Sequence, residues 1–283
     1  MGDCRYCSKP AGFLKKQHSE CAEKCRAAHL AMVILAQEMA RDEAFDSLEP
    51  EFRKKGEAGL VPAAETRAIL VEGWKREVDR LLEDNLITDE EEGTLTRYTK
   101  HFELQQEELD SSGTLTRLVK AGVLRDLSHG KIEHRLNISG NLPFNFSRGE
   151  SVIWVFPKAE YLEQKTQRRY EGGSAGVSFR VARGVYLRTS AFHGRPIDAT
   201  YTAVVDTGIM CITNKSLYFS GAIKGFRIAL DKISTIQPHS DGVTVFGDSS
   251  SAKPQTFRNQ DGWFTYNLLM NVSHTQTPVP DPQ

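Results

Sequence analysis

Residues 202–246 decide the fold, and they read TAVVDTGIMCITNKSLYFSGAIKGFRIALDKISTIQPHSDGVTVF. Two apolar segments, 209–212 and 217–219, are separated by the polar residues 213–216, which predicts a hairpin. Residues 226–230 are apolar at every second position, which is the period of a half-buried strand. This region therefore predicts an antiparallel meander of short strands.

The hydrophobic period changes from that of a strand to that of a helix toward the C-terminus. Asp241-Gly242 lies between two extended segments, and it favours a two-residue turn because both central residues need positive φ. Asp261 stands where an N-cap is expected. The apolar residues that follow recur at helical spacing, at Trp263, Phe264, Leu268 and Val272. We therefore expect one C-terminal helix to close the meander.

Residues 150–273 resemble the pleckstrin-homology-like superfamily, in particular its bacterial PH and GRAM-type members. The likeness is carried by Leu-Tyr-Phe-Ser-Gly at 217–221, by residues 224–233, by the Asp-Gly turn at 241–242 and by the final helix. It implies a bent, nearly closed β-barrel with the C-terminal helix plugging one open end. It also implies recognition of a protein partner or of an anionic lipid headgroup, since domains of this kind do both.

The same resemblance implies where a lipid headgroup would bind. Such domains use basic residues in loops at the open end, and Lys215, Lys224 and Arg227 are the candidates here. Each Lys or Arg near an anionic surface contributes about 1 kcal/mol. Residues 150–283 carry a net charge of only +3, so we favour a protein partner over a lipid.

Four of the five cysteines lie within the first 25 residues, and this clustering favours a metal site over disulfides in a cytosolic chain. Cys4 and Cys7 form a C-x2-C knuckle, and His18 and Cys21 form an H-x2-C pair. The full pattern predicts a structural zinc site of the Cys3His type. Its layout is similar to small treble-clef and LIM-type half-sites.

Cys25 leaves a second ligand set open. It follows Cys21 by one helical turn, so it could replace His18 as the fourth ligand. We favour His18, because an H-x2-C pair after a short basic loop is a frequent second half of zinc sites. Either set gives zinc four protein ligands and leaves no position for water, which predicts a structural role rather than a catalytic one.

Helical periodicity dominates the region between the cysteines and the meander. An amphipathic helix is expected directly after the knuckle, with apolar residues at Ala27, Leu30, Ala31, Ile34 and Leu35. The helical period is consistent from residue 62 to residue 127, which predicts a small bundle of three or four helices. Thr88-Asp-Glu-Glu91 has the form of a capping box at one helix start.

These patterns predict a multidomain α+β protein. The expected parts are a zinc knuckle with its following helix (1–56), a short helical bundle (57–136), a linker (137–149), the PH-like barrel with its helix (150–273) and a disordered tail (274–283). The barrel is expected to begin with a strand at 152–156 and to include paired segments near 177–183 and 185–188.

Charge and hydropathy exclude several classes of protein. The net charge is −1, and residues 57–110 are acidic with a net charge of −9. No block of the chain has the basic excess of a dedicated nucleic-acid binder. The sequence has no apolar stretch long enough to span a bilayer and no secretory signal, so we expect a cytoplasmic protein, with a peripheral position at a membrane left open.

No motif of a known active site is present in the sequence. It contains no G-x-S-x-G, no glycine-rich phosphate loop, no H-E-x-x-H and no dinucleotide fingerprint. We therefore expect a non-enzymatic, zinc-containing binding or scaffold protein whose PH-like domain recognises a partner. The alternative is a nucleic-acid-binding protein that uses the zinc module.

Overall fold

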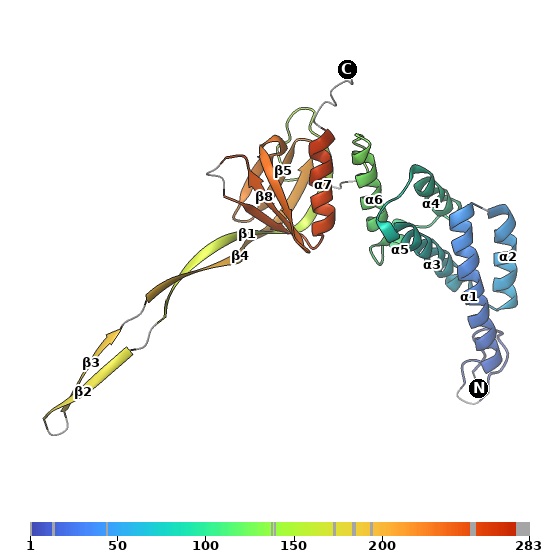
Figure 1. The fold of residues 1–283 in the computed structure, drawn as a ribbon. Helices are drawn as coiled ribbons and strands as arrows, with labels where there is room; N and C mark the ends of the chain where they lie inside the picture. Colours follow the sequence, from blue (N-terminus) through green and yellow to red (C-terminus); the bar gives the residue numbers. More distant parts are fainter. Residues whose placement is uncertain are drawn as a thin grey trace, which may run out of the picture. The chain divides into compact units, whose positions relative to one another are not determined.

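The chain folds as two compact units, Met1–Arg135 and Leu136–Gln283 (Figure 1). The computed structural model describes residues 2–12, 15–43, 45–136, 138, 140–171, 174–182, 185–192, 195–249 and 253–275, with the backbone alone for 166–200 and 274–275. The first unit is helical and the second is built on an antiparallel sheet, so the predicted α+β class is confirmed. Most of the expected disordered tail, from residue 276 onward, lies outside the described residues.

The described part of the first unit contains six α-helices and one 3-10 turn. They are α1 (Ser19–Asp42), α2 (Phe45–Ala58), α3 (Ala63–Leu81), η1 (Leu82–Asp84), α4 (Asp89–His101), α5 (Gln106–Leu109) and α6 (Thr114–Ser128). Helix α1 packs against α2, α3 and α4, and the largest fully buried side chains at these contacts are Met32, Met39, Ile69, Trp74, Leu95 and Tyr98. The predicted knuckle and the predicted bundle thus belong to one compact unit.

The buried face of α1 differs from the predicted one. Leu30 and Ile34, expected on the apolar face of the helix, are 58% and 55% exposed. Of the five expected residues only Leu35 is buried, and the other buried side chains of the central turns are Met32, Val33, Ala36, Met39 and Ala40. Small residues explain the choice, because α3 comes so close that a Cβ added to Gly73 would lie 2.4 Å from the Cβ of Ala36. Periodicity allows both faces, whereas this close approach allows only one.

Two polar features fix α4 and α6. The predicted capping box is confirmed: Thr88 Oγ1 accepts from the backbone N–H of Glu91 at 3.2 Å, and the Glu91 carboxylate accepts from the Thr88 N–H at 2.9 Å. Farther on, Arg125 and Arg135 both contact the carboxylates of Glu92 and Asp126. This ion cluster joins α4, α6 and the segment that follows α6.

The second unit contains nine strands, one 3-10 turn and one α-helix within the described residues. They are β1 (Val152–Glu171), β2 (Ser174–Ala182), β3 (Val185–Phe192), β4 (Arg195–Thr213), β5 (Ser216–Gly221), β6 (Gly225–Ala229), η2 (Leu230–Lys232), β7 (Ile233–Pro238), β8 (Gly242–Gly247), β9 (Gln255–Arg258) and α7 (Gly262–Thr275). Seven strands form one antiparallel sheet in the order β6-β5-β4-β1-β9-β8-β7, and α7 packs against β7 and β8.

The hairpin predicted in this unit is confirmed, but the two-residue turn is not. Residues 213–216 join β4 to β5 in a hairpin. Strand β7 joins β8 through a longer turn, closed by the pairing of Pro238 with Val243, and neither Asp241 nor Gly242 has the positive φ that the two-residue turn needs. The carboxylate of Asp261 accepts a hydrogen bond from the backbone N–H of Phe264 at 3.1 Å, as expected of an N-cap. Local chemistry therefore placed the β4–β5 hairpin and the start of α7 correctly, whereas the Asp-Gly pair marked the place of a turn but not its type.

The sheet is not the nearly closed barrel that the resemblance implies. Its two edge strands, β6 and β7, do not pair with each other in the described residues. The interior is instead closed by side chains: Phe219 and Phe257 lie within 6.0 Å of each other between ring centroids, and Phe264 of α7 lies 4.9 Å from Trp154. Aromatic rings and the C-terminal helix thus fill the interior of this open sheet, whereas a closed barrel would also have hydrogen bonds between its edge strands.

Strands β1 and β4 continue beyond the sheet as a two-stranded ribbon (Figure 1). On β1, only residues 160–162 pair with β9. Beyond them β1 remains paired with β4 alone, as far as Glu171 opposite Arg195. Strands β2 and β3 pair only with each other. We call residues 164–202 the arm. The strand expected at 152–156 is therefore much longer than predicted. The paired segments expected near 177–183 and 185–188 correspond to β2 and β3, which pair with each other.

None of the described helices has both the length and the apolar character needed to cross a membrane.

Candidate metal centre

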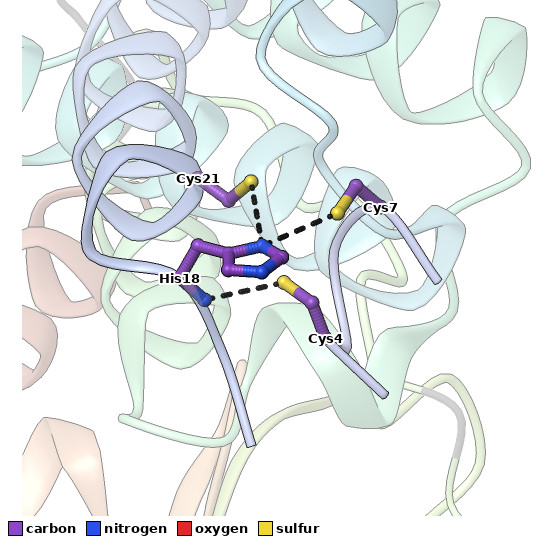
Figure 2. Close-up of side chains that lie close together, drawn as sticks. All are labelled: Cys4, Cys7, His18 and Cys21. Atoms are coloured by element: carbon purple, nitrogen blue, oxygen red, sulfur yellow. Dashed lines mark hydrogen bonds between the residues drawn. The ribbon is translucent and has the colours of Figure 1, made fainter. Parts of the chain in front are cut away.

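A tight N-terminal turn positions the first two candidate ligands. The backbone N–H of Cys4 donates to the carbonyl of Lys9 at 2.7 Å, and the N–H of Ser8 donates to the carbonyl of Cys4 at 2.8 Å. Ser8 adopts a positive φ of 56°, which lets the chain reverse within the knuckle. The reversal places the side chains of Cys4 and Cys7 on the same side of the loop (Figure 2).

The start of α1 supplies the other two candidates. The helix begins at Ser19, so His18 is its N-cap and Cys21 lies in its first turn. The backbone N–H of Arg5 donates to the carbonyl of Lys16 at 3.0 Å and ties the knuckle to the segment before the helix. One loop and one helix start therefore face each other across the site.

The four predicted ligands converge on one point (Figure 2). One donor atom from each of Cys4, Cys7, His18 and Cys21 lies within 4.8 Å of all the others. His18 Nδ1 is 3.5 Å from the sulfur of Cys7 and 3.7 Å from that of Cys21. A tetrahedral zinc ion with typical bond lengths requires a sulfur-to-nitrogen separation of about 3.5 Å. The spacing therefore fits a tetrahedral metal ion.

The imidazole of His18 is held in the orientation that a ligand needs. Its Nε2 lies 3.0 Å from the carbonyl oxygen of Pro10. A carbonyl oxygen can only accept, so Nε2 carries the hydrogen and Nδ1 presents its lone pair to the thiols. A hydrogen bond from the second ring nitrogen is the usual support of a metal-bound histidine.

The thiols have opposing electrostatic environments. Burial tends to raise the pKa of Cys4, but hydrogen bonds from the backbone N–H groups of His18, Tyr6 and Cys7 outweigh burial and lower the pKa to about 6. Burial, with the neighbouring thiols Cys7 and Cys4, raises the pKa of Cys21 to about 11. Crowded thiols resist joint ionisation, and a bound divalent cation removes that resistance.

Cys25, the alternative fourth ligand, lies outside this group of donors. Its side chain is buried and its sulfur is 3.9 Å from Oε2 of Glu65. Burial, and then the charge of Glu65, raise the pKa of the Cys25 thiol. The structure thus brings together the Cys3His set and leaves Cys25 beside an open depression of about 370 Å³ that Arg5 and Tyr6 also line.

The three basic residues proposed for ligand binding do not form one cluster. Lys215 precedes β5 and its Nζ donates to the carbonyl of Arg148 at 3.0 Å, whereas Lys224 follows β5 and pairs with Glu163 at 3.2 Å. They therefore lie at opposite ends of the same strand. Arg227, on β6, donates from Nε to the hydroxyl of Ser216 at 2.7 Å. Only Lys215 and Arg227 share one end of the sheet.

Asp206 is a structural residue that the sequence analysis did not single out. Its buried carboxylate accepts from the backbone N–H groups of Ile223 and Lys224, each at 2.7 Å, and of Ala222 at 3.3 Å. The hydrogen bond from the Lys224 N–H is the main cause that lowers the pKa of Asp206. An acidic residue inside the apolar segment 203–212 was the available signal. Asp206 holds the β5–β6 turn beside the base of the arm.

No protein-family model and no curated protein matches the chain. The interpretation of the candidate site therefore rests on its geometry.

Proposed function

We propose that the protein is a non-enzymatic, zinc-containing binding protein. Its N-terminal centre holds a structural zinc ion, and its second unit is a PH-like module that recognises a protein partner or an anionic lipid headgroup. Because thiols remain reduced and available to a metal under reducing conditions, we also propose that the protein is cytoplasmic.

The observation that carries the zinc proposal is the convergence of three sulfurs and one oriented imidazole within 4.8 Å. Four protein ligands complete a tetrahedron, so no coordination position is left for water or substrate. Among the described residues of the knuckle, only Cys4 and Ala11 are buried apolar residues. A metal ion supplies the stabilisation that a segment of this size otherwise lacks.

The strand order supports a PH-like second unit. Two antiparallel meanders, β4-β5-β6 and β7-β8-β9, flank the first strand of the sheet, and the chain ends in a helix that packs against β7 and β8. This arrangement agrees with the strand and turn pattern on which the resemblance rests. The arm departs from a compact domain of this kind, because it extends the connection between β1 and β4.

Two exposed apolar side chains support a role in recognition. Ile223, at the tip of the β5–β6 turn, is 72% exposed, and Trp263, in the first turn of α7, is 51% exposed. Leu30 and Ile34 add an exposed apolar pair on α1. Exposed tryptophan and large aliphatic side chains are typical of contact surfaces for proteins. These positions favour a protein partner over a lipid.

The environments of two reactive residue types support a non-enzymatic role. Cys211 is fully buried in β4, and burial raises the pKa of its thiol to about 12, which makes it a poor nucleophile. His239 Nε2 lies 2.8 Å from the hydroxyl of Thr244 and is engaged locally. Neither residue faces a second catalytic group in the described contacts.

Metal analysis of the purified full-length protein tests the zinc proposal. We expect close to one zinc ion per chain by elemental mass spectrometry, and release of that zinc by a strong chelator should unfold the first turns of α1. A protein purified without chelator that carries no metal, and that retains its helix content, would contradict the proposal.

Co-sedimentation with vesicles tests the recognition proposal. The full-length protein should pellet with anionic but not with neutral vesicles if it recognises a lipid, and Lys215→Ala with Arg227→Ala, which removes the two cations at one end of the sheet, should then reduce pelleting. Absence of pelleting with both vesicle types favours the protein partner. In that case Trp263→Ala should reduce capture of a partner in affinity purification, and unchanged capture would count against a role of Trp263 in recognition.

A further inference from the structure

The arm, residues 164–202, has a charge unlike that of the rest of the chain. It carries seven Lys or Arg residues and two Asp or Glu residues, for a net charge of +5, while all other residues together carry −6. The second half of the chain averages only +3, because the remaining residues of 150–283 carry −2. The fold therefore separates a basic ribbon from an otherwise acidic protein.

The β1–β4 part of the arm gathers cations on one face. The register pairs Lys165 with Tyr201, Arg169 with Ile197, and Glu171 with Arg195. Residues two apart on a strand share a face, so Lys165, Arg169 and Arg195 occupy the same face of this ribbon. Lys165 and Arg169 are four residues apart, which is about 13 Å along the strand.

The β2–β3 part of the arm shows a second basic face. Ser178 pairs with Arg188, and Arg180 pairs with Tyr186. These two pairs are separated by two register positions, so Arg180 and Arg188 share a face. The one pair between them, Phe179 with Leu187, belongs to the opposite face. The register of each ribbon thus places two arginines on one face, Arg169 with Arg195 and Arg180 with Arg188.

Nothing within the described residues of the chain covers the arm with a third strand. A two-stranded ribbon is at best marginally stable by itself, and closely spaced like charges oppose its compact form further. A partner with negative charge distributed along its length would relieve this repulsion. The composition and the geometry therefore indicate an extended polyanion.

We propose that the arm binds double-stranded DNA through its phosphate backbone. Six of the seven cations of the arm are arginines, whose planar guanidinium groups match phosphate oxygens in pairs. A two-stranded β-ribbon has the width that the major groove admits. Contacts of this kind position a protein on DNA without reading its sequence.

The composition of the β1–β4 part favours DNA over a membrane. Its register pairs Gln164 with Thr202 and Thr166 with Thr200 on the face opposite Lys165. Polar residues thus occupy both faces, so this ribbon has no apolar face to enter a bilayer. A charged ribbon that remains in water suits the grooves of a duplex.

Fluorescence anisotropy of a labelled DNA duplex of about three helical turns tests the proposal with the full-length protein. Between about 50 and 200 mM salt the affinity should fall by about 1,000-fold, as expected for five or more phosphate contacts. A charge-neutral arm is made by replacing five arginines with Gln, at Arg168, Arg169, Arg180, Arg188 and Arg195. This variant should bind at least about 100-fold more weakly at the lowest salt, and the magnitude of its salt slope should fall by four to five.

A matched control removes the same charge from the helical unit. It replaces five exposed cations with Gln, at Arg53, Lys54, Arg76, Lys100 and Lys131, and its duplex affinity should change by less than about threefold. Circular dichroism and zinc content should be the same for both variants and the unmodified protein. The zinc measurement also keeps this test separate from the zinc proposal.

Three results would overturn the proposal. The first is no duplex binding by the unmodified protein at about 50 mM salt. The second is equal weakening in the arm variant and the control variant, since binding would then depend on net charge alone. The third is arm-dependent binding to phosphatidylserine vesicles without duplex binding, which would assign the arm to anionic membranes.

Discussion

The knuckle and the arm differ in what can stabilise them. Neither the knuckle, residues 2–18, nor the arm, residues 164–202, encloses a hydrophobic core within its described contacts, so each must offset the entropy of ordering its chain by another means. The knuckle has four donor atoms within 4.8 Å that can share one metal ion. The described contacts of the arm are the backbone pairs of its two ladders. The first can be completed by an ion, whereas the second calls for an external partner.

The two regions also differ in how they join the rest of the protein. The knuckle runs directly into α1 through His18, which is both a candidate ligand and the N-cap of the helix. The arm leaves the sheet next to Asp206, whose carboxylate fixes the neighbouring β5–β6 turn. Loss of a metal bound there should therefore loosen the start of a helix, while loss of the Asp206 contacts should loosen the β5–β6 turn and the neighbouring arm.

The largest expected effect comes from removing one metal ligand. Cys7→Ser replaces a thiolate by a weakly coordinating hydroxyl, so zinc content should fall to well below half an ion per chain. The knuckle and the first turns of α1 should then exchange their amide hydrogens rapidly, because metal binding and folding are coupled in such segments, with about 10 kcal/mol or more at stake. Elemental analysis and hydrogen exchange measure both effects.

Cys25→Ser is the matched control, because it removes a nearby cysteine that lies outside the donor group. Zinc content should remain near one ion per chain. Loss of zinc in Cys25→Ser with retention in a His18→Ala variant would instead identify the alternative ligand set.

The next largest effect tests whether the helices hold together independently of the metal. In Gly73→Ala the new methyl group would lie 2.4 Å from the Cβ of Ala36 and 2.7 Å from its carbonyl carbon. The helices must separate, and the free energy of unfolding should fall by about 1–3 kcal/mol with zinc still bound. Urea denaturation measures this loss.

Gly93→Ala provides the contrast on another helix. There the new Cβ would contact only the flexible end of Arg97, at 3.2 Å. Alanine in a helix interior should stabilise the unit by up to about 1 kcal/mol. The same destabilisation in both variants would show that close helix packing is not the cause.

A smaller effect is expected at the base of the arm. Asp206→Asn replaces one accepting oxygen by an NH2 group that faces the N–H donors of residues 222–224. Limited proteolysis should cut the β5–β6 turn and the arm faster, with little change in the helical unit. Glu163→Gln, which removes the partly exposed ion pair with Lys224 but no backbone contact of the turn, should leave the cleavage rate unchanged, and acceleration by both variants alike would contradict the role given to Asp206.

The smallest effect is a dependence on pH in the helical unit. Burial tends to raise the pKa of Asp126, but hydrogen bonds from Arg135 and Arg125 outweigh burial and hold the pKa below its ordinary value. A carboxyl group with a lowered pKa stabilises the fold fully above about pH 4, and this contribution is lost as the pH falls through the folded-state pKa.

Asp126→Asn should therefore lower stability near neutral pH and have less effect as the pH falls below about 4. Urea denaturation of both proteins at several pH values gives the difference in free energy. A difference that does not change with pH would mean that the charge of Asp126 is not what stabilises the cluster.

The sequence was sufficient wherever the signal is local. The capping box at Thr88, the hairpin at 213–216 and the N-cap at Asp261 depend on residues a few positions apart, and all three occur as predicted. The metal centre belongs to the same class, because the spacing of its cysteines and histidine lies within one turn and one helix start. Short-range geometry is fixed by backbone sterics and by side-chain chemistry that the sequence states directly.

Tertiary structure decided what depends on distant residues. Leu30 and Ile34 fit a helical period, but the approach of Gly73 to Ala36 buried the other face of α1. Lys215 and Lys224 are nine residues apart in sequence, yet β5 separates them. The net charge of +5 on residues 164–202 is present in the sequence, but only the pairing of β1 with β4 shows that these residues extend from the sheet as one ribbon. Periodicity and composition describe segments one at a time, whereas burial and separation in space are properties of how the segments meet.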